Sequence, residues 1–285
     1  MSKLKLSLSI ITLLFGILML DSFIGFYLGI RPFKVNSTLT PKDFNVPYER
    51  VTFLTQDHLK LSGWFIPNKN PKAPTIIVCH GYPADKGNIL PSTLFLHQDY
   101  QLFYFDFRYL GESEGSYSTI GKNEVDDLLA AITFLKSRGI QQVGVWGYSL
   151  GGVVALLTAP KTPAIKAIVA QAPYARLDWV AEDNYHPPYL NKVLGELTRF
   201  WAWLFLGYDI NKVNPALTAS HIAVPTLIIH SKTDHLISLK HATLFQAAAN
   251  HNPMLNPMVV DYAMHGEHFQ GYETMITHFF NTYLK

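Results

Sequence analysis

Cysteine is almost absent from this sequence of 285 residues, which contains Cys79 alone. A single cysteine excludes an internal disulfide, and the apolar run that ends at Cys79 predicts a buried strand. No Lys or Arg adjoins Cys79 in the sequence to lower the pKa of its thiol. We therefore interpret this residue as an inert core side chain rather than a reactive nucleophile.

An excess of charge is also missing, because the formal net charge is only +2 with histidines neutral. The chain has no long run of Lys or Arg, so it lacks the electrostatic footprint of a nucleic-acid-binding protein. Internal repeats and low-complexity segments are absent as well. Nucleic acid is therefore not an expected partner, and one continuous pattern should describe the folded part of the chain.

A long apolar run is present at the N-terminus, from residue 6 to residue 30, and only Asp21 and Ser22 interrupt it appreciably. At about 1.5 Å per residue, such a helix crosses a hydrocarbon layer of roughly 30 Å with some tilt. A cleaved signal peptide would have a shorter run and a small-x-small site, and no convincing site precedes Arg31. We expect an uncleaved membrane anchor over residues 1–30, with a cleaved signal or a soluble amphipathic helix as the alternatives.

The orientation of this anchor is less strongly specified by charge. Lys3 and Lys5 on one flank are opposed by Arg31, Lys34 and Lys42 on the other. A basic segment followed by an apolar run is nevertheless the usual export signal. We expect a single-pass protein of the cell membrane with its N-terminus inside and its folded domain outside the cytoplasm.

Residues 31–47 are rich in Pro, Asn, Ser, Thr and Lys and show no helical or strand period, which predicts a linker. The folded domain is expected over residues 48–285 and to begin with a hairpin formed by residues 51–54 and 59–66. Short apolar runs then alternate with helical segments, which predicts an α/β fold with a mostly parallel sheet covered on both faces. These runs span residues 75–79, 102–107, 143–148, 167–172, 226–231 and 258–262, and the helical segments span 123–136, 239–250 and 270–284.

One interval breaks this alternation, between the strand ending at Ala172 and the strand beginning at Thr226. A structureless loop of that length is improbable inside a compact domain, so we expect a helical lid insertion at about residues 174–222. Its aromatic residues serve packing or recognition, and the sequence does not separate the two roles. They are Trp179, Tyr185, Tyr189, Phe200, Trp201, Trp203 and Phe205.

The pentapeptide 147–151 reads Gly-Tyr-Ser-Leu-Gly and matches the pattern G-x-S-x-G. A match this short is weak alone, but a buried-strand pattern precedes it and a segment able to open a helix follows it. This strand, sharp turn and helix would hold Ser149 exposed at the sheet edge as a nucleophile. In the structural alternative, the serine merely caps the helix.

A serine hydroxyl needs a base and an orienting carboxylate to become nucleophilic. Asp234 is the best candidate for the acid, because it follows the strand 226–231 directly, and catalytic groups of open α/β sheets gather at the carboxyl ends of strands. Asp261 and Asp209 are weaker competitors. The first belongs to an expected strand and the second to the expected insertion.

Two histidines follow the last expected strand, and only one can act as the base. His265 comes sooner after the strand and precedes Gly266, which would let the loop lean over the site, so we prefer it to His268. A metal site made by the same pair is disfavoured, because the H-E-x-x-H spacing is absent. We expect no metal and no cofactor.

Two backbone N–H groups are needed to stabilise the oxyanion of a tetrahedral intermediate. Leu150, the residue after the nucleophile, is expected to supply one. Tyr82, in the loop that follows the strand 75–79, is expected to supply the other. We expect His80, in the same loop, to shape the oxyanion loop rather than to act as a base.

Together these ordered motifs resemble the α/β-hydrolase superfamily, most closely its serine-aminopeptidase-like and bile-acid-conjugating-like branches. The motifs are His80-Gly81, residues 106–115, 147–152 and 225–230 with Asp234, and His265-Gly266, so that the resemblance covers about residues 51–284. It implies an eight-strand sheet, a triad of Ser149, Asp234 and His265, and oxyanion donors at Tyr82 and Leu150. Tyr109 departs from the pattern, since glycine is usual at that position.

We therefore expect a serine hydrolase that cleaves an ester, thioester or amide through an acyl-enzyme, most consistent with a carboxylesterase or lipase. Its partners would be a small acyl substrate, lipid-like if it is delivered at the membrane, and the membrane itself. A serine peptidase acting on small peptides is a second hypothesis. A third, of another class, is a non-catalytic membrane-tethered binding protein.

Overall fold

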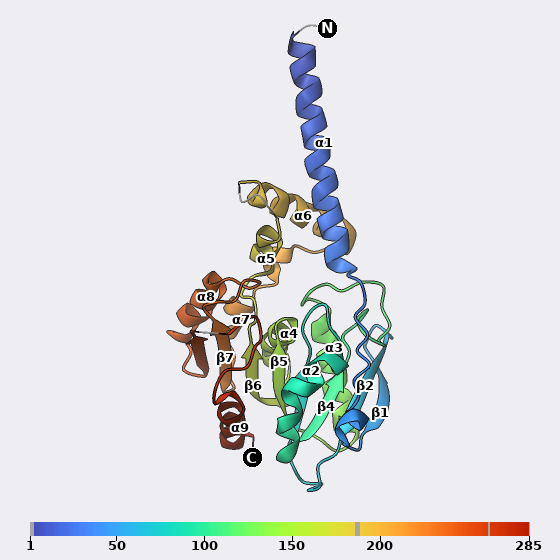
Figure 1. The fold of residues 1–285 in the computed structure, drawn as a ribbon, viewed down its shortest axis with the longest axis vertical. Coiled ribbons are helices and arrows are strands. Elements are labelled where there is room, and N and C mark those ends of the chain that lie inside the picture. Colours follow the sequence, from blue (N-terminus) through green and yellow to red (C-terminus); the bar gives the residue numbers. More distant parts are fainter. Residues whose placement is uncertain (1–2, 186–188, 262, 285) are drawn as a thin grey trace. The chain divides into compact units, whose positions relative to one another are not determined.

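Eight strands of the described chain form one sheet in the order β1-β2-β4-β3-β5-β6-β7-β8 (Figure 1). In the computed structural model the strands are β1 (Glu49–Leu54), β2 (Lys60–Ile66), β3 (Thr75–Cys79), β4 (Gln101–Phe105), β5 (Val143–Tyr148), β6 (Ile165–Gln171), β7 (Thr226–Ser231) and β8 (Leu255–Val260). The pairs β1–β2 and β2–β4 are antiparallel, and all other neighbouring pairs are parallel. The expected mostly parallel sheet of eight strands, with its N-terminal hairpin, is confirmed.

The structure describes residues 3–185, 189–261 and 263–284, and the chain divides into two units. The sheet unit comprises Phe33–Ala175 and Asn214–Lys285, and the helical unit comprises Met1–Pro32 and Arg176–Val213. The middle of the expected insertion thus groups with the N-terminal helix, while its two ends group with the sheet. Tyr262, expected at the end of the last strand, lies outside the described residues.

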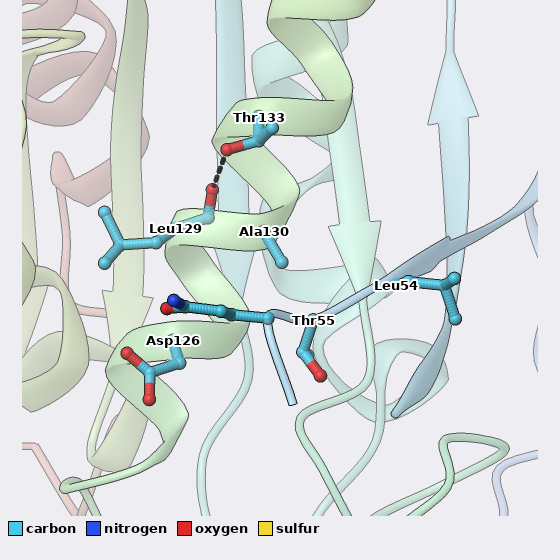
Figure 2. A pocket seen from close by; sticks show the side chains of 7 residues that line it. Leu54, Thr55, Asp126, Leu129, Ala130 and Thr133 are labelled. Carbon is cyan, nitrogen blue, oxygen red and sulfur yellow. Dashed lines mark hydrogen bonds between the residues drawn. The ribbon is translucent and has the colours of Figure 1, made fainter. Parts of the chain in front are cut away.

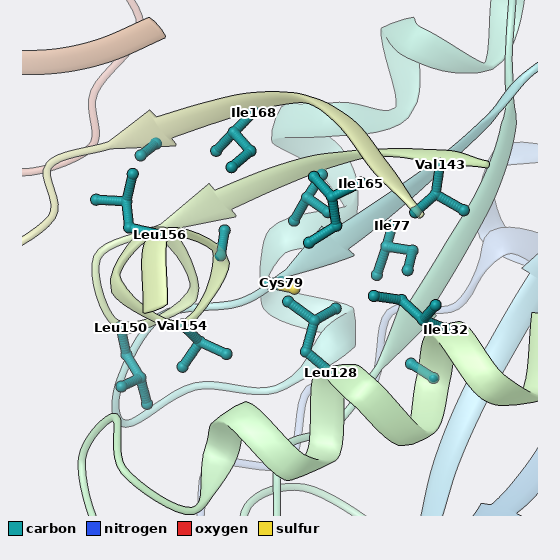
Figure 3. Close-up of a cluster of buried hydrophobic side chains, with 14 of the residues drawn as sticks. Ile77, Cys79, Leu128, Ile132, Val143, Leu150, Val154, Leu156, Ile165 and Ile168 are labelled. Atoms are coloured by element: carbon teal, nitrogen blue, oxygen red, sulfur yellow. The ribbon is translucent and has the colours of Figure 1, made fainter. Parts of the chain in front are cut away.

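Helices cover both faces of the sheet. This cover is required because the parallel strands are apolar along their whole length and therefore present apolar side chains on both faces. These helices are α2 (Lys86–Thr93), α3 (Glu124–Ser137), α4 (Leu150–Thr158), α7 (Pro215–Ala219), α8 (Leu239–Ala249) and α9 (Tyr272–Tyr283). On one face, Leu128 of α3 and Val154 of α4 pack in a buried cluster that also encloses Cys79 (Figure 3). On the other face, Leu90 of α2 and Ile276 of α9 pack in a second cluster. Burial raises the pKa of the Cys79 thiol, which keeps it protonated at neutral pH.

The helical unit contains α1 (Lys3–Ile30), α5 (Leu177–Asp183) and α6 (Asn191–Leu206). Helix α1 has 28 residues and a window of mean hydropathy 2.1. At about 1.5 Å per residue it extends about 42 Å, which exceeds a hydrocarbon layer of roughly 30 Å. The chain therefore has one N-terminal helix that is long and apolar enough to span a membrane.

Candidate active site

Ser149 occupies the sharp turn between β5 and α4, where its backbone has φ 50° and ψ −112°. A non-glycine residue in such a sparsely populated conformation costs on the order of 1–3 kcal/mol, so the surrounding structure must impose it. The flanking glycines are required by close backbone packing. A Cβ atom on Gly151 would lie 2.2 Å from the Cys79 carbonyl oxygen, and one on Gly147 would lie 2.4 Å from Gly151. The turn places Ser149 at the carboxyl edge of the sheet, where ligands of α/β folds bind. Ser149 is only 8% exposed, so the expectation of an exposed serine is wrong, because the segment at Gly81 packs close to it.

Asp234 and His265 form a hydrogen-bonded pair in which Nδ1 of the histidine lies 2.6 Å from Oδ2 of the carboxylate. The other carboxylate oxygen accepts from the backbone N–H groups of Leu236 (2.9 Å) and Ile237 (2.8 Å). Burial acts to raise the pKa of Asp234, but the hydrogen bonds from His265 and Ile237 outweigh it and hold this pKa below its ordinary value. The carboxylate is therefore ionised at neutral pH and fixes the imidazole with Nδ1 as the donor.

The competing candidates lie in other environments. The His268 ring stacks on Tyr272, with centroids 3.9 Å apart, and its Nε2 has no hydrogen-bond partner in the described part of the chain. Asp261 is exposed and pairs with Lys232 at 2.5 Å. Asp209 belongs to the helical unit, where it pairs with Arg199. Of the candidate acids and bases, the fold brings together only His265 and Asp234.

A chain of buried hydrogen bonds holds the loop that carries His265. The Trp146 indole N–H donates to the Tyr272 hydroxyl (3.0 Å), and this hydroxyl donates to Oε1 of Gln171 (2.6 Å). The Gln171 side-chain amide then donates to the Gly266 carbonyl oxygen (2.9 Å). The sequence contains no local signal for this chain, because the bonded partners lie 95 to 126 positions apart.

Tyr148 connects this loop to the nucleophile turn. Its hydroxyl donates to the His265 carbonyl oxygen at 3.1 Å, and its ring centroid lies 5.1 Å from that of the imidazole. Gly266 has φ 74°, and a Cβ atom there would lie 2.1 Å from the Tyr148 ring. A glycine is therefore needed after His265 to let the loop approach the residue beside Ser149.

The loop expected to supply an oxyanion donor follows β3. His80 is fully buried, its Nδ1 lies 2.7 Å from the Gly81 carbonyl oxygen, and its Nε2 accepts from the backbone N–H of Phe107 at 3.0 Å. Both ring nitrogens are thus engaged with backbone, which fits a role in shaping the loop. A Cβ atom on Gly81 would lie 3.5 Å from Cβ of Ser149, so the segment leading to Tyr82 passes directly beside Ser149.

The motif of residues 106–115 anchors the loops around the site through a buried ion pair. The Asp106 carboxylate accepts from Nζ (2.5 Å) and the backbone N–H (2.7 Å) of Lys86, and both side chains are at most 3% exposed. Lys86 also bonds to Glu112 at 2.7 Å. Tyr109, where the related sequences usually have glycine, adopts φ 68°. This left-handed conformation is the physical reason that glycine suits the position.

His230 is a buried histidine beside the acid, only 2% exposed. Burial lowers its pKa from 6.5 to about 4, against an opposing effect of Asp234. His230 therefore stays neutral when folded, whereas the unfolded chain binds a proton there below about pH 6.5. The unfolded state is then favoured as the pH falls, so stability is present above pH 6.5 and is lost between pH 6.5 and 4.

We accordingly expect His230→Leu to lose less stability than the wild type between pH 6.5 and 4. The difference between the two losses in free energy of unfolding should be up to roughly 3 kcal/mol. Urea denaturation of the full chain in detergent at several pH values measures this. His251→Leu, at an exposed position, is the control and should keep the wild-type slope. Equal slopes in wild type and His230→Leu would contradict the assignment.

A separate hollow lies on the surface of the sheet unit, between the end of β1 and α3 (Figure 2). Its lining residues are Leu54, Thr55, Gln56, Asp126, Leu129, Ala130 and Thr133. None of them belongs to the group around Ser149, so the candidate site is defined by the chemistry at the sheet edge rather than by this hollow.

The topology of the sheet and the strained serine turn define an α/β hydrolase. The chain belongs to this family: residues 74–207 match the model of the alpha/beta hydrolase fold. The uncharacterized protein YqkD of Bacillus subtilis is 30% identical over 217 residues, which are 72% of this chain and 68% of that protein. The uncharacterized membrane protein YNL320W of Saccharomyces cerevisiae is 33% identical over 132 residues, 44% of this chain and 45% of that protein.

Among solved structures, the esterase Pf2001 of Pyrococcus furiosus superposes with a TM-score of 0.75 and 27% identity. The match covers 90% of this chain and all of the esterase. Family membership and these neighbours support hydrolase activity.

Proposed function

We propose that this protein is a membrane-anchored serine hydrolase that cleaves an acyl ester with Ser149, His265 and Asp234 as its triad. The observation that carries the proposal is the 2.6 Å hydrogen bond between His265 and Asp234. It lies at the sheet edge that also carries the strained Ser149 turn, since β5, β6 and β7 run parallel. The proposed nucleophile and the hydrogen-bonded acid–base pair are thus carried by the same edge of the sheet, although they are far apart in the chain.

In the proposed mechanism, Ser149 Oγ attacks the substrate carbonyl carbon while His265 Nε2 removes the hydroxyl proton. Asp234 stabilises the imidazolium through the Nδ1 hydrogen bond. The oxyanion accepts from the backbone N–H groups of Tyr82 and Leu150; as the first residue of α4, Leu150 has an N–H without an intrahelical acceptor. The imidazolium then protonates the leaving alcohol, and water, activated by His265, hydrolyses the acyl-enzyme.

An ester is the preferred substrate class because the esterase of Pyrococcus furiosus matches almost the whole chain. Thioesters and amides pass through the same tetrahedral chemistry and therefore belong in the substrate panel. The apolar helix α1 supports a further part of the proposal, that the substrate is an acyl or lipid-like molecule met at a membrane.

We expect a fluorophosphonate probe to label Ser149 in the full chain, detected by mass spectrometry of the modified peptide. His265→Ala should abolish labelling because the hydroxyl loses its base, and His268→Ala, the matched control, should retain it. Competition with aryl esters, thioesters, aminoacyl amides and lipid esters then ranks the substrates. A folded protein that several serine probes leave unlabelled would instead indicate a non-catalytic binding protein.

We also propose that α1 spans the cell membrane with the N-terminus inside and the sheet unit outside. The basic residues Lys3 and Lys5 before the apolar run support this orientation. A membrane-impermeant maleimide should label the exposed position Thr133→Cys in intact cells, whereas an epitope tag placed before Met1 should become accessible only after permeabilisation. The opposite pattern would reverse the orientation.

A further inference from the structure

Helix α6 of the helical unit has two apolar faces. On one face, Leu194 and Ala202 are buried within the unit. On the other, Val193, Phe200 and Leu204 are 47%, 41% and 51% exposed. Their spacing of seven and four residues places these three side chains on one side of the helix. An amphipathic helix of a soluble domain would present polar residues there, so this exposed stripe needs a partner.

The buried face of α6 packs on the last part of α1, in the same unit. The Trp201 indole N–H donates to Ser22 Oγ at 3.0 Å, and the Trp201 ring lies edge-on to Phe23 with centroids 5.2 Å apart. Phe205 stacks against Phe26 at 6.1 Å. These contacts fix α6 at one level along α1, next to residues 22–26 (Figure 1).

That level coincides with the expected surface of a bilayer. Every described residue of α1 from Lys3 to Ile17 is exposed, and buried or half-buried positions begin only at Leu18. At about 1.5 Å per residue, the segment from Lys3 to Leu20 extends about 27 Å, close to the roughly 30 Å of a hydrocarbon core. Residues 22–26, and with them α6, then lie at the boundary between lipid and water.

The aromatic residues of the helical unit near residues 22–26 of α1 are of the types found at the boundary between lipid and water. Trp201, Trp203 and Tyr185 gather here, and tryptophan and tyrosine are enriched where membrane proteins cross the headgroup region. Trp203, 61% exposed, flanks the exposed stripe. Helix α6 has two basic residues: Arg199 is neutralised by Asp209 at 2.8 Å, and the exposed Lys192 alone does not make the basic face that would require anionic lipids.

We propose that α6 lies in the bilayer surface beside α1 and inserts Val193, Phe200 and Leu204 into the boundary between headgroups and acyl chains. The partner is a lipid bilayer, and neutral phosphatidylcholine suffices for the insertion because it is apolar. The inference rests on the proposed membrane anchoring and is independent of the serine chemistry. It makes the insertion between β6 and β7 part of the membrane-bound portion of the molecule.

The single native cysteine makes a direct test practical, because Cys79 is fully buried and an introduced cysteine is the only accessible one in the described chain. Nitroxide labels are placed at Phe200→Cys and Leu204→Cys in the full chain, in phosphatidylcholine nanodiscs. Matched controls are Lys192→Cys, an exposed position on the polar side of α6, and Thr133→Cys on the sheet unit, with Leu13→Cys in α1 as the lipid reference. Collision with oxygen, which dissolves in lipid, is compared with collision with a water-soluble nickel chelate.

We expect the labels at residues 200 and 204 to lose collision with the nickel chelate and to gain it with oxygen, as the label at residue 13 does. The labels at 192 and 133 should keep collision with nickel. If the label at 13 is in lipid while those at 200 and 204 stay open to nickel, the inference is wrong and the anchoring stands. A label at 13 open to nickel would overturn the anchoring and the inference together. Spin–spin broadening at 200 and 204 that disappears on dilution with unlabelled protein would identify a second copy as the partner and would overturn the inference.

Discussion

Ser149→Ala is expected to lower kcat for a short-chain aryl ester by about 10⁴-fold or more, while KM changes little. The substitution removes the atom that attacks the carbonyl carbon, and only the oxyanion donors and substrate binding remain to accelerate hydrolysis. Because Ser149 occupies a strained backbone conformation imposed by its neighbours, the loss of one oxygen should leave the fold intact. Steady-state kinetics of the purified full chain in detergent measure the loss.

The control for this experiment is Ser137→Ala, which removes an exposed hydroxyl at the end of α3. It should retain wild-type kcat, and both variants should keep wild-type circular dichroism. Wild-type turnover by folded Ser149→Ala would show that another nucleophile performs the reaction. The proposed triad would then be wrong, although membership of the hydrolase family would stand.

Asp234→Asn is expected to reduce kcat by about 10³- to 10⁴-fold. The amide oxygen of asparagine still accepts from the N–H groups of Leu236 and Ile237, so the loop should keep its shape. The side-chain NH₂, however, would face His265 Nδ1 as a donor and favour the tautomer that carries its proton on Nε2. That tautomer cannot take the proton from Ser149, and the imidazolium formed during the reaction would lose its counter-charge.

Asp261→Asn is the matched control, because it makes the same chemical change in the other aspartate near the end of the sheet. Its carboxylate is exposed and pairs only with a half-exposed Lys232 in the described chain, an interaction worth about 0–1 kcal/mol. We expect kcat to stay close to wild type. A large loss of kcat in Asp261→Asn with none in Asp234→Asn would indicate that Asp261 is the acid. The site would then have to adopt a different arrangement during the reaction.

The places of Ser149 and Asp234 in the fold were predictable because each has a local signature. Ser149 lies between a buried-strand run and a helix start, and its flanking glycines mark the tight turn that the backbone contacts of Gly151 require. Asp234 follows a strand directly, so its place at the carboxyl edge followed from the fold class. The base was ambiguous, because His265 and His268 share one loop and the sequence contains no measure of which ring reaches the carboxylate.

The sequence by itself determined the class of fold, the strand pattern and the apolar N-terminal helix, and it predicted the chemical type of the site. These properties depend on periodicity and on short motifs, which neighbouring residues carry. Tertiary structure alone decided which histidine lies beside Asp234 and that the Trp146, Tyr272 and Gln171 side chains hold its loop. It alone also grouped the centre of the insertion with α1, through contacts such as Trp201 to Ser22, 179 positions apart. Such contacts leave no local pattern, because they depend on how whole elements pack.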